Sequence, residues 1–325
     1  MLTALAWCAA GLAGLIAGAE LVLHGGIQLA GRLGISPIVI GLTIVAVGTS
    51  APELAVGIDA VLQGSGDIAV GNIAGTNVVN ILLILGLSAL MRPLALRAET
   101  LWLDLPMMVV ASFALLYMAS DGDLSRTEGI VLVSASLIYT TAVLHVARRE
   151  RKAVRMSFAR EIAAATRPSE SNGSLIPNLT ALVVGLGVIV VAADWLVDGS
   201  VSLARFWGVS DAFIGLTIVA IGTSSPELVT TIVSTLRKQR DIAIGNLLGS
   251  SVYNILFILG VTCLVPSSAI PVAQSLIAVD IPVMTVVALV CVPVFYSGRE
   301  VSRTEGALFV GAYIVYIAYL IAVRT

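Results

Sequence analysis

The chain has 325 residues and a net charge of −2, and apolar residues make up 58% of it while charged residues make up only 12%. Soluble globular proteins carry about twice that share of charged residues, roughly 25%. The composition therefore excludes a soluble domain and predicts an all-α polytopic membrane protein. Two histidines and three scattered cysteines exclude an imidazole or thiolate metal cluster, and nothing indicates nucleic-acid binding.

Turn signals and charges divide the chain into ten apolar segments, each long enough to cross a hydrocarbon core of about 30 Å. In chain order, the expected transmembrane helices are 2–30, 37–62, 67–91, 99–119, 127–146, 176–204, 211–236, 241–265, 271–296 and 303–323. The one long polar stretch, 147–175, lies between the fifth and sixth helices and is expected to form a flexible cytoplasmic connector.

The distribution of basic residues predicts the orientation in the membrane. With the connector inside, 15 of the 18 Lys and Arg residues fall in cytoplasmic loops, and only Arg126, Arg205 and Arg324 do not. Cytoplasmic loops are enriched in Lys and Arg. We therefore expect a multi-pass protein of a prokaryotic plasma (inner) membrane, with both termini extracellular or periplasmic.

The two halves of the chain repeat each other. Residues 41–54 read GLTIVAVGTSAPEL and match residues 215–228, GLTIVAIGTSSPEL, at 12 of 14 positions; residues 67–86 match 241–260 at 13 of 20, with the same offset of 174. Each half holds five expected helices, an odd number, so the second half enters the membrane from the opposite side.

This arrangement predicts two inverted five-helix repeats, residues 1–146 and 176–325, on either side of the connector. Inverted repeats are typical of secondary transporters, whose binding sites lie near the midplane where discontinuous helices of both halves meet.

Each repeat places a Pro-Glu pair in the middle of an apolar helix. Pro52 and Pro226 lack an N–H and clash with the carbonyls of Gly48 and Gly222, four residues earlier, so the helices are expected to break there. A carbonyl freed in lipid needs another partner, and a cation can serve. A lone carboxylate at this depth costs roughly 2.5 kcal/mol or more, so a pair at equivalent positions indicates one shared polar centre.

Hydroxyl and amide side chains surround the two carboxylates in the sequence. They lie within a turn of each glutamate, or one helical turn apart in the third and eighth helices. The candidate site residues are Glu53, Glu227, Thr49, Ser50, Thr223, Ser224, Thr76, Asn80, Ser250 and Asn254. All are hard oxygen donors, which suit Ca²⁺ or Na⁺ and do not suit zinc or copper.

Other acidic residues allow two interpretations. Glu20 and Asp194 correspond across the repeat, and either could line an ion path or face water. Asp59, Asp104 and Asp280 are expected near helix ends or in interhelical hydrogen bonds.

The motifs GTSAPE and GTSSPE, each followed by a GN-xx-G-[ST]-xxx-N block, resemble the α-repeats of the cation/Ca²⁺ exchanger superfamily, in particular bacterial sodium/calcium antiporters. The resemblance covers both repeats. It implies that Glu53 and Glu227 bind Ca²⁺, that the other candidate residues and the carbonyls of Ala46 and Ala220 serve Ca²⁺ and flanking Na⁺ sites, and that the first and sixth helices slide against the rest.

One departure concerns charge. Asparagine stands at both Asn80 and Asn254, where some members carry one aspartate, so the centre holds a formal charge of −2. One Ca²⁺ or two Na⁺ would neutralise it, and coupling stoichiometry does not transfer from the family.

The expected function is secondary-active exchange of Na⁺ for Ca²⁺ by alternating access, in the direction of Ca²⁺ extrusion. Both ions are the transported substrates, and the lipid bilayer surrounds the protein. No enzymatic activity and no cofactor are expected. The main alternative is an H⁺/Ca²⁺ exchanger of the same superfamily. An intramembrane aspartyl protease is a remote alternative, because Gly64-Ser65-Gly66-Asp67 fits GxGD but no Tyr-Asp pair occurs. A passive channel is disfavoured by paired carboxylates, and the oligomeric state stays open.

Overall fold

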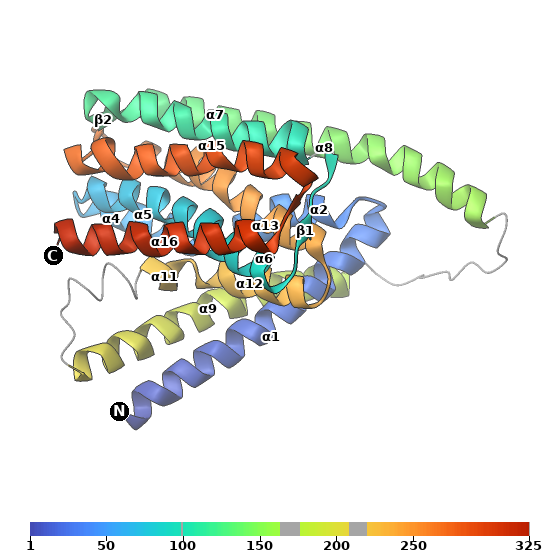
Figure 1. Ribbon diagram of the computed structural model, residues 1–325, viewed down its shortest axis with the longest axis horizontal. Coiled ribbons are helices and arrows are strands. Elements are labelled where there is room, and N and C mark those ends of the chain that lie inside the picture. The colour runs from blue at the N-terminus through green and yellow to red at the C-terminus, as the bar shows by residue number, and fades with distance from the viewer. Residues whose placement is uncertain (99, 163–175, 208–219, 325) are drawn as a thin grey trace.

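The computed structural model describes residues 1–98, 100–162, 176–207 and 220–324; of 147–162, Ala220 and Arg324 it describes only the backbone (Figure 1). Within these ranges, nine helices are long and apolar enough to cross a membrane. They are Leu2–Leu33, Pro37–Leu62, Gly66–Met91, Thr100–Asp121, Arg126–Val146, Ile176–Phe206, Arg240–Leu264, Leu276–Gly298 and Arg303–Val323. The all-α polytopic fold is therefore confirmed.

Most of these helices are divided into shorter elements. The helices and strands of the first half are α1 (Leu2–Leu33), α2 (Pro37–Ile40), α3 (Ala46–Thr49), α4 (Ala51–Leu62), α5 (Gly66–Val78), α6 (Gly86–Met91), β1 (Leu94–Ala95), α7 (Leu105–Met118), β2 (Asp123–Leu124) and α8 (Arg126–Ile162). In the second half they are α9 (Ile176–Phe206), α11 (Ala220–Thr223), α12 (Ser225–Leu236), α13 (Arg240–Tyr253), α14 (Gly260–Leu264), β3 (Ile270–Pro271), α15 (Ile281–Gly298), β4 (Glu300–Val301) and α16 (Arg303–Arg324).

The described residues include five π-helical segments, of which three connect α-helices and two lie directly before α7 and α15; a short 3₁₀ turn (Ala119–Asp121) follows α7. The π-helical segments are Gly41–Val45, Val79–Leu85, Thr100–Asp104, Asn254–Leu259 and Leu276–Asp280. The sequence analysis did not predict them. Each widens one turn of the helix, which changes the direction in which the following side chains project.

The seventh expected helix and the expected connector differ in part from what the structure describes. The seventh helix, expected at 211–236, is described only from Ala220 onward, as α11 and α12, so its first part lies outside the described residues. Residues 147–162, the first half of the expected connector, are helical, because α8 continues without a break to Ile162. Residues 147–162 are rich in Arg, Glu and Ala, which are strong helix formers, and that composition extends the helix beyond the membrane.

Two small antiparallel sheets relate the halves. β1 pairs with β4 and β2 pairs with β3, so each sheet takes one strand from each half. β1 and β3 precede equivalent helices, α7 and α15, yet β1 and β2 lie at opposite ends of the helical bundle (Figure 1). Equivalent segments of the halves therefore lie at opposite ends, as expected if the two halves run in opposite directions.

The helices α1 and α9 form a pair of their own along one side of the bundle (Figure 1). Glycines bring their backbones together: a Cβ on Gly11 would lie 2.6 Å from the backbone nitrogen of Leu196, and one on Gly25 would lie 2.7 Å from the carbonyl oxygen of Asn178. A separate hydrophobic cluster, which includes Leu15 and Ile189, packs this pair against the remaining helices. The pair is thus set apart from the larger core around α5, α13 and α15.

Candidate cation-binding site

Both Pro-Glu motifs interrupt their helices, as the sequence predicts. α3 ends at Thr49 and α4 begins at Ala51, with Ser50 between them at φ −84° and ψ 12°; Ser224 separates α11 from α12 at φ −86° and ψ 6°. Each proline lies in the first turn of the following helix, where its missing N–H has no helical partner to lose. Glu53 and Glu227 consequently occupy the first turns of α4 and α12, where the helix dipole favours negative charge.

The carboxylate of Glu227 joins elements of both halves. Its Oε1 accepts hydrogen bonds from the Ser50 hydroxyl at 2.9 Å and from the Ser250 hydroxyl at 3.4 Å. The Ser250 hydroxyl also lies 3.4 Å from the carbonyl oxygen of Ala46. Four predicted site residues, from three different helices, therefore meet at one point inside the protein.

Close helix packing makes this meeting possible. α13 crosses the second transmembrane helix at Gly249, where a Cβ would lie 2.7 Å from the carbonyl oxygen of Leu42. A larger residue would push α13 away, and Ser250 would no longer reach Ala46 and Glu227.

The second carboxylate is as deeply buried but has no hydrogen-bond partner in the described part of the chain. Glu53 is 0% exposed, and neither of its carboxylate oxygens accepts a hydrogen bond from a described residue. The two glutamates interact electrostatically across the centre. A buried carboxylate without donors is strongly unfavourable, and contact with a positively charged group would remove that cost.

Further polar atoms at the centre lack partners among the described residues. Both amide atoms of Asn80 and of Asn254 are buried and unbonded, as are the Ser224 hydroxyl and the Oε2 of Glu227. Buried polar side chains in native proteins are normally hydrogen-bonded. Their concentration around two carboxylates is the pattern expected of ligands for a bound cation.

The two asparagines occupy equivalent places in the π-helical segments. Asn254 begins its segment, and Asn80 is the second residue of the equivalent one. π-helical turns occur frequently at functional sites because they redirect side chains and carbonyls. Thr76 and Ser250, one turn earlier, are also buried, at 3% and 0% exposure.

The remaining predicted residues differ in their surroundings. Thr49 is fully buried and donates at 3.3 Å to the Ala46 carbonyl, whereas Thr223 is only partly buried. Ala220 begins α11, and its side chain lies outside the described residues. The Gly222 carbonyl, which the sequence analysis expects to need a partner, accepts a hydrogen bond from the Ser225 hydroxyl at 2.6 Å.

The sequence analysis missed one residue of this centre, Asn246. Its Oδ1 accepts from the Thr49 hydroxyl at 3.1 Å, and its Nδ2 donates to Thr231 at 3.2 Å, so it fixes the orientation of Thr49. The available signal was its identity with Asn72 in the repeated block.

Glu20, one of the two corresponding acidic residues, contacts a basic residue of the other half. Its Oε1 accepts from Arg237 Nε at 2.7 Å and lies 2.5 Å from Arg237 Nη2, in an exposed ion pair between α1 and the end of α12. Asp194 is exposed on α9. Asp104 and Asp280 accept interhelical hydrogen bonds from Tyr139 and Tyr316, at 2.9 and 2.7 Å, as expected.

The donor set selects for a particular class of cation. The centre combines two carboxylates with hydroxyls, amide oxygens and a backbone carbonyl, and the described residues contain no group of three or more His, Cys, Asp or Glu of the kind that marks a transition-metal site. Such hard oxygen donors suit Ca²⁺ and Na⁺. The residues present therefore fit these ions as cargo.

Comparison with known proteins agrees with this geometry. The family model described as "Sodium/calcium exchanger protein" matches residues 3–145 and 178–322, which are nearly the whole of both halves. The chain belongs to the sodium/calcium exchanger family.

Relatives of this exchanger chain match it from end to end. The inner membrane protein YrbG of Escherichia coli is 35% identical over 98% of this chain and 97% of its own. The sodium/calcium exchanger MaX1 of Methanosarcina acetivorans is 29% identical over 95% of this chain and 96% of its own. The solved structure of the sodium-calcium exchanger NCX_Mj superposes with a TM-score of 0.82 at 27% identity, covering 98% of each chain. The exchanger family consists of transporters, so the expectation that this chain is not an enzyme is confirmed.

Proposed function

We propose that this protein is a secondary antiporter that exchanges Na⁺ for Ca²⁺ across a prokaryotic inner membrane. The observation that carries the proposal is the pair of buried glutamates from two interrupted helices, of which Glu53 has no donor among the residues that the structure describes. Support comes from the family match and from relatives whose names describe sodium/calcium exchange. Ca²⁺ and Na⁺ are cargo here, and the transport cycle needs no cofactor.

The proposed ligands are the residues gathered around these two carboxylates. Glu53 and Glu227 contribute the charge, and the neutral oxygens complete the coordination of Ca²⁺ and of flanking Na⁺. The neutral donors are Thr49, Ser50, Thr76, Asn80, Thr223, Ser224, Ser250 and Asn254, with the carbonyls of Ala46 and Ala220.

Exchange follows from competition for this charge. Two carboxylates are neutralised by one Ca²⁺ or by two Na⁺, whereas both loads together would leave excess positive charge in a medium of low dielectric constant. Either load therefore displaces the other. The cell's inward Na⁺ gradient would then drive Ca²⁺ out.

The architecture provides a way to expose this centre to either side. We propose that residues 1–146 and 176–325 are inverted repeats joined by the cytoplasmic connector 147–175, and that both termini face the extracellular or periplasmic side. The separate α1–α9 pair would slide along the bundle and open the centre alternately to each side, which is the motion that inverted repeats permit.

The decisive experiment measures Ca²⁺ uptake into proteoliposomes loaded with Na⁺ and diluted into Na⁺-free buffer, with K⁺-loaded and acid-loaded vesicles in parallel. We expect uptake from Na⁺-loaded vesicles alone. Uptake from acid-loaded vesicles would instead indicate H⁺/Ca²⁺ exchange, which no feature of the described site specifically supports.

Substitutions at the two glutamates test the site itself. Glu53→Gln and Glu227→Gln should each reduce Ca²⁺ uptake to background while the protein remains folded and inserted. Asp59→Asn is the matched control, because Asp59 is exposed near the end of the same helix as Glu53 and, within the described ranges, accepts a hydrogen bond only from Gln63. Wild-type exchange in both glutamine variants would refute the site.

A further inference from the structure

The turn between α12 and α13 lies on a polar cavity whose lining includes none of the proposed cation ligands. This cavity has a volume of about 350 Å³ and is lined by the turn itself, the start of α2 and the residue after α6. The lining residues are Pro37, Arg92, Lys238, Gln239, Arg240 and Asp241.

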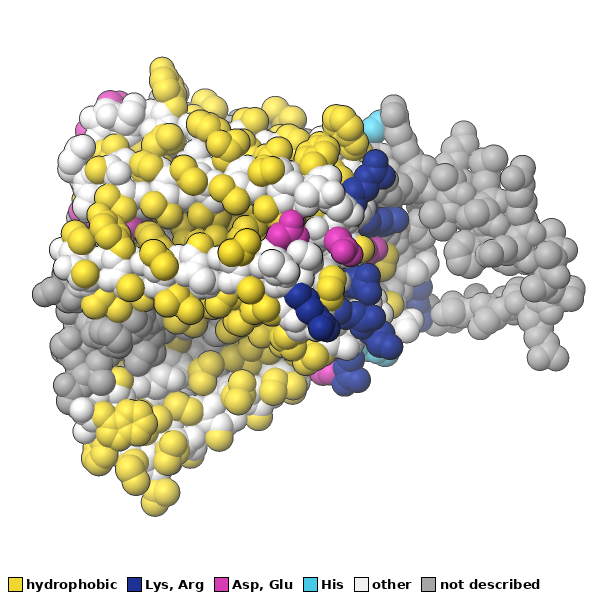
Figure 2. Space-filling model, viewed as in Figure 1, with side chains coloured by type: hydrophobic (Ala, Val, Ile, Leu, Met, Phe, Trp, Pro, Cys, Tyr) yellow, Lys and Arg dark blue, Asp and Glu magenta, His cyan; other side chains and the backbone are white. Residues whose placement is uncertain are grey.

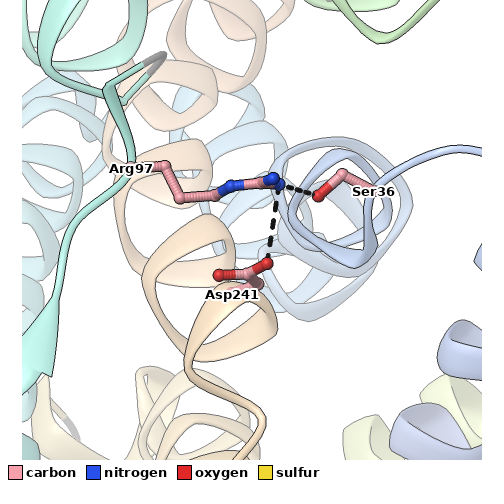
Figure 3. A network of polar contacts seen from close by, with 3 residues as sticks. All are labelled: Ser36, Arg97 and Asp241. Carbon is pink, nitrogen blue, oxygen red and sulfur yellow. Dashed lines mark hydrogen bonds and ion pairs between the residues drawn. The ribbon is translucent and has the colours of Figure 1, made fainter. Parts of the chain in front are cut away.

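The charge around the cavity is strongly unbalanced. Arg92, Lys238 and Arg240 line it, and none forms an ion pair with a described residue. The one acidic residue, Asp241, is paired with Arg97 at 3.6 Å, and Arg97 also donates to the Ser36 hydroxyl (Figure 3). Three basic side chains therefore face this space without a counter-charge from the described part of the chain.

The equivalent turn of the first half shows that this charge is not required by the fold. There the residues are Gln63, Gly64, Ser65, Gly66 and Asp67, so glycine or a neutral side chain stands at the position of each of the four residues 237–240. Asp67 accepts a hydrogen bond of 2.5 Å from the Ala273 backbone instead of pairing with an arginine.

Lys238 is the most informative of these residues. It has a left-handed backbone, with φ 64°, as has its counterpart Gly64, with φ 75°. Non-glycine residues rarely adopt this conformation, because the Cβ atom crowds the following carbonyl. The turn thus holds a lysine at a strained position where the other repeat has the residue that removes the strain.

The start of α13 adds further attraction for an anion. α13 has 14 residues, its first residues Arg240 and Asp241 line the cavity, and its N-cap residue, Gln239, makes no side-chain capping hydrogen bond. Free N–H groups and the helix dipole at such an end favour negative charge.

We propose that this cavity binds a phosphate-bearing anion. Three unpaired basic side chains and a helix N-terminus supply the charge and the donors that phosphate oxygens accept. The bundle end where β1 lies carries most of the visible Lys and Arg side chains (Figure 2), as expected for the end beside an anionic lipid leaflet. The anion is a phospholipid headgroup or a soluble phosphate, and both present the same chemistry.

Occupation of the cavity would affect the transport helices directly. The cavity joins the beginning of the second transmembrane helix to the end of the third and to the turn between the seventh and eighth, which are the four helices that carry the Pro-Glu and asparagine motifs. A bound anion would hold these four helix ends together.

The test measures binding without measuring transport, so it stands apart from the proposed exchange activity. The full-length protein in nonionic detergent is titrated with phosphatidylglycerol, with phosphatidylcholine and with inorganic phosphate. The readouts are the thermal unfolding midpoint and the amount of lipid retained, measured by native mass spectrometry.

Three variants separate the cavity from general electrostatics and from folding. The triple variant R92Q/K238Q/R240Q should bind phosphatidylglycerol about 100-fold more weakly, because each basic residue beside an anionic headgroup contributes a factor of about five. R148Q/R149Q/R151Q removes the same charge from the connector and should bind like the wild type. K238G should bind about five-fold more weakly yet unfold at no lower a temperature without lipid, since glycine suits that backbone.

Each outcome decides the proposal. Selective stabilisation by phosphatidylglycerol, lost in the triple variant and kept in the connector variant, supports a headgroup site. Equal stabilisation by inorganic phosphate with the same variant pattern supports a soluble phosphate as the ligand. Equal losses in the triple and connector variants, or no response of the wild type to any anion, would overturn it.

Discussion

Ser50 donates a hydrogen bond of 2.9 Å to Glu227 and thereby joins the interrupted helix of one half to the carboxylate of the other. The reciprocal contact is absent among the described residues, because the Ser224 hydroxyl and both Glu53 oxygens have no partner. The two halves are nearly identical in sequence here, so the difference lies in the conformation. Glu227 is held by protein donors, while Glu53 is left without one.

This asymmetry predicts different effects of two equivalent substitutions. Without Ca²⁺ and Na⁺, Ser50→Ala should destabilise the protein by about 1.5–3 kcal/mol, since it removes a hydrogen bond to a charged group. Ser224→Ala removes a hydroxyl that bonds to no residue of the described chain, and should leave stability nearly unchanged. Unfolding in detergent with chelator present measures both. Equal destabilisation by the two substitutions would show that the asymmetry does not exist in solution.

The hydrogen bond between Tyr139 and the buried Asp104 predicts a structural role outside the cation centre. Tyr139→Phe leaves Asp104 with one donor fewer, and should lower the free energy of unfolding by about 1–3 kcal/mol. Tyr296→Phe is the control, because its hydroxyl makes a longer bond of 3.3 Å to a carbonyl and the side chain is 46% exposed. Thermal unfolding in detergent should separate the two, and a Tyr139→Phe midpoint equal to that of the wild type would contradict the prediction.

The close packing of α1 on α9 predicts a sharp dependence on glycine. Gly11→Ala would place a Cβ 2.6 Å from the Leu196 nitrogen and 2.8 Å from the Ala192 carbonyl, both backbone atoms that cannot move aside. We expect destabilisation of about 1–3 kcal/mol from overpacking and slower exchange. Gly187→Ala, on α9 itself, meets no described atom within 4 Å and should be neutral or slightly stabilising. If both variants behave alike, the α1–α9 contact is looser than the structure indicates.

The ion pair of Glu20 with Arg237 predicts an effect on rate without much effect on stability. Both side chains are well exposed, so the pair contributes less than about 1 kcal/mol to folding. It joins α1, which is expected to slide, to the end of α12, so Glu20→Gln should change the exchange rate and its salt dependence. Arg237→Gln should have the same effect, and the double variant no further one. Additive effects on the rate would show that the two residues act independently.

Much of this molecule follows from the sequence alone. Apolar length and composition give the transmembrane helices, because a bilayer requires about 20 apolar residues for each crossing. The duplicated Pro-Glu motif gives the two helix breaks at Ser50 and Ser224, because proline cannot continue a helix from the preceding turn. Hydroxyls and amides near each glutamate give the donor set, because buried carboxylates in lipid need polar neighbours.

Tertiary structure decided the rest, because it depends on which segments meet. By repeat symmetry, Ser50 could donate to Glu227 and Ser224 could equally donate to Glu53. In the packed helices only the first of these hydrogen bonds forms among the described residues. The contacts of Asn246 with Thr49 and Thr231 place it at the cation centre. Glu20 contacts Arg237, which is 217 residues away in the chain. Periodicity and spacing describe one helix at a time, whereas these contacts are set by distances between helices that close glycine packing determines.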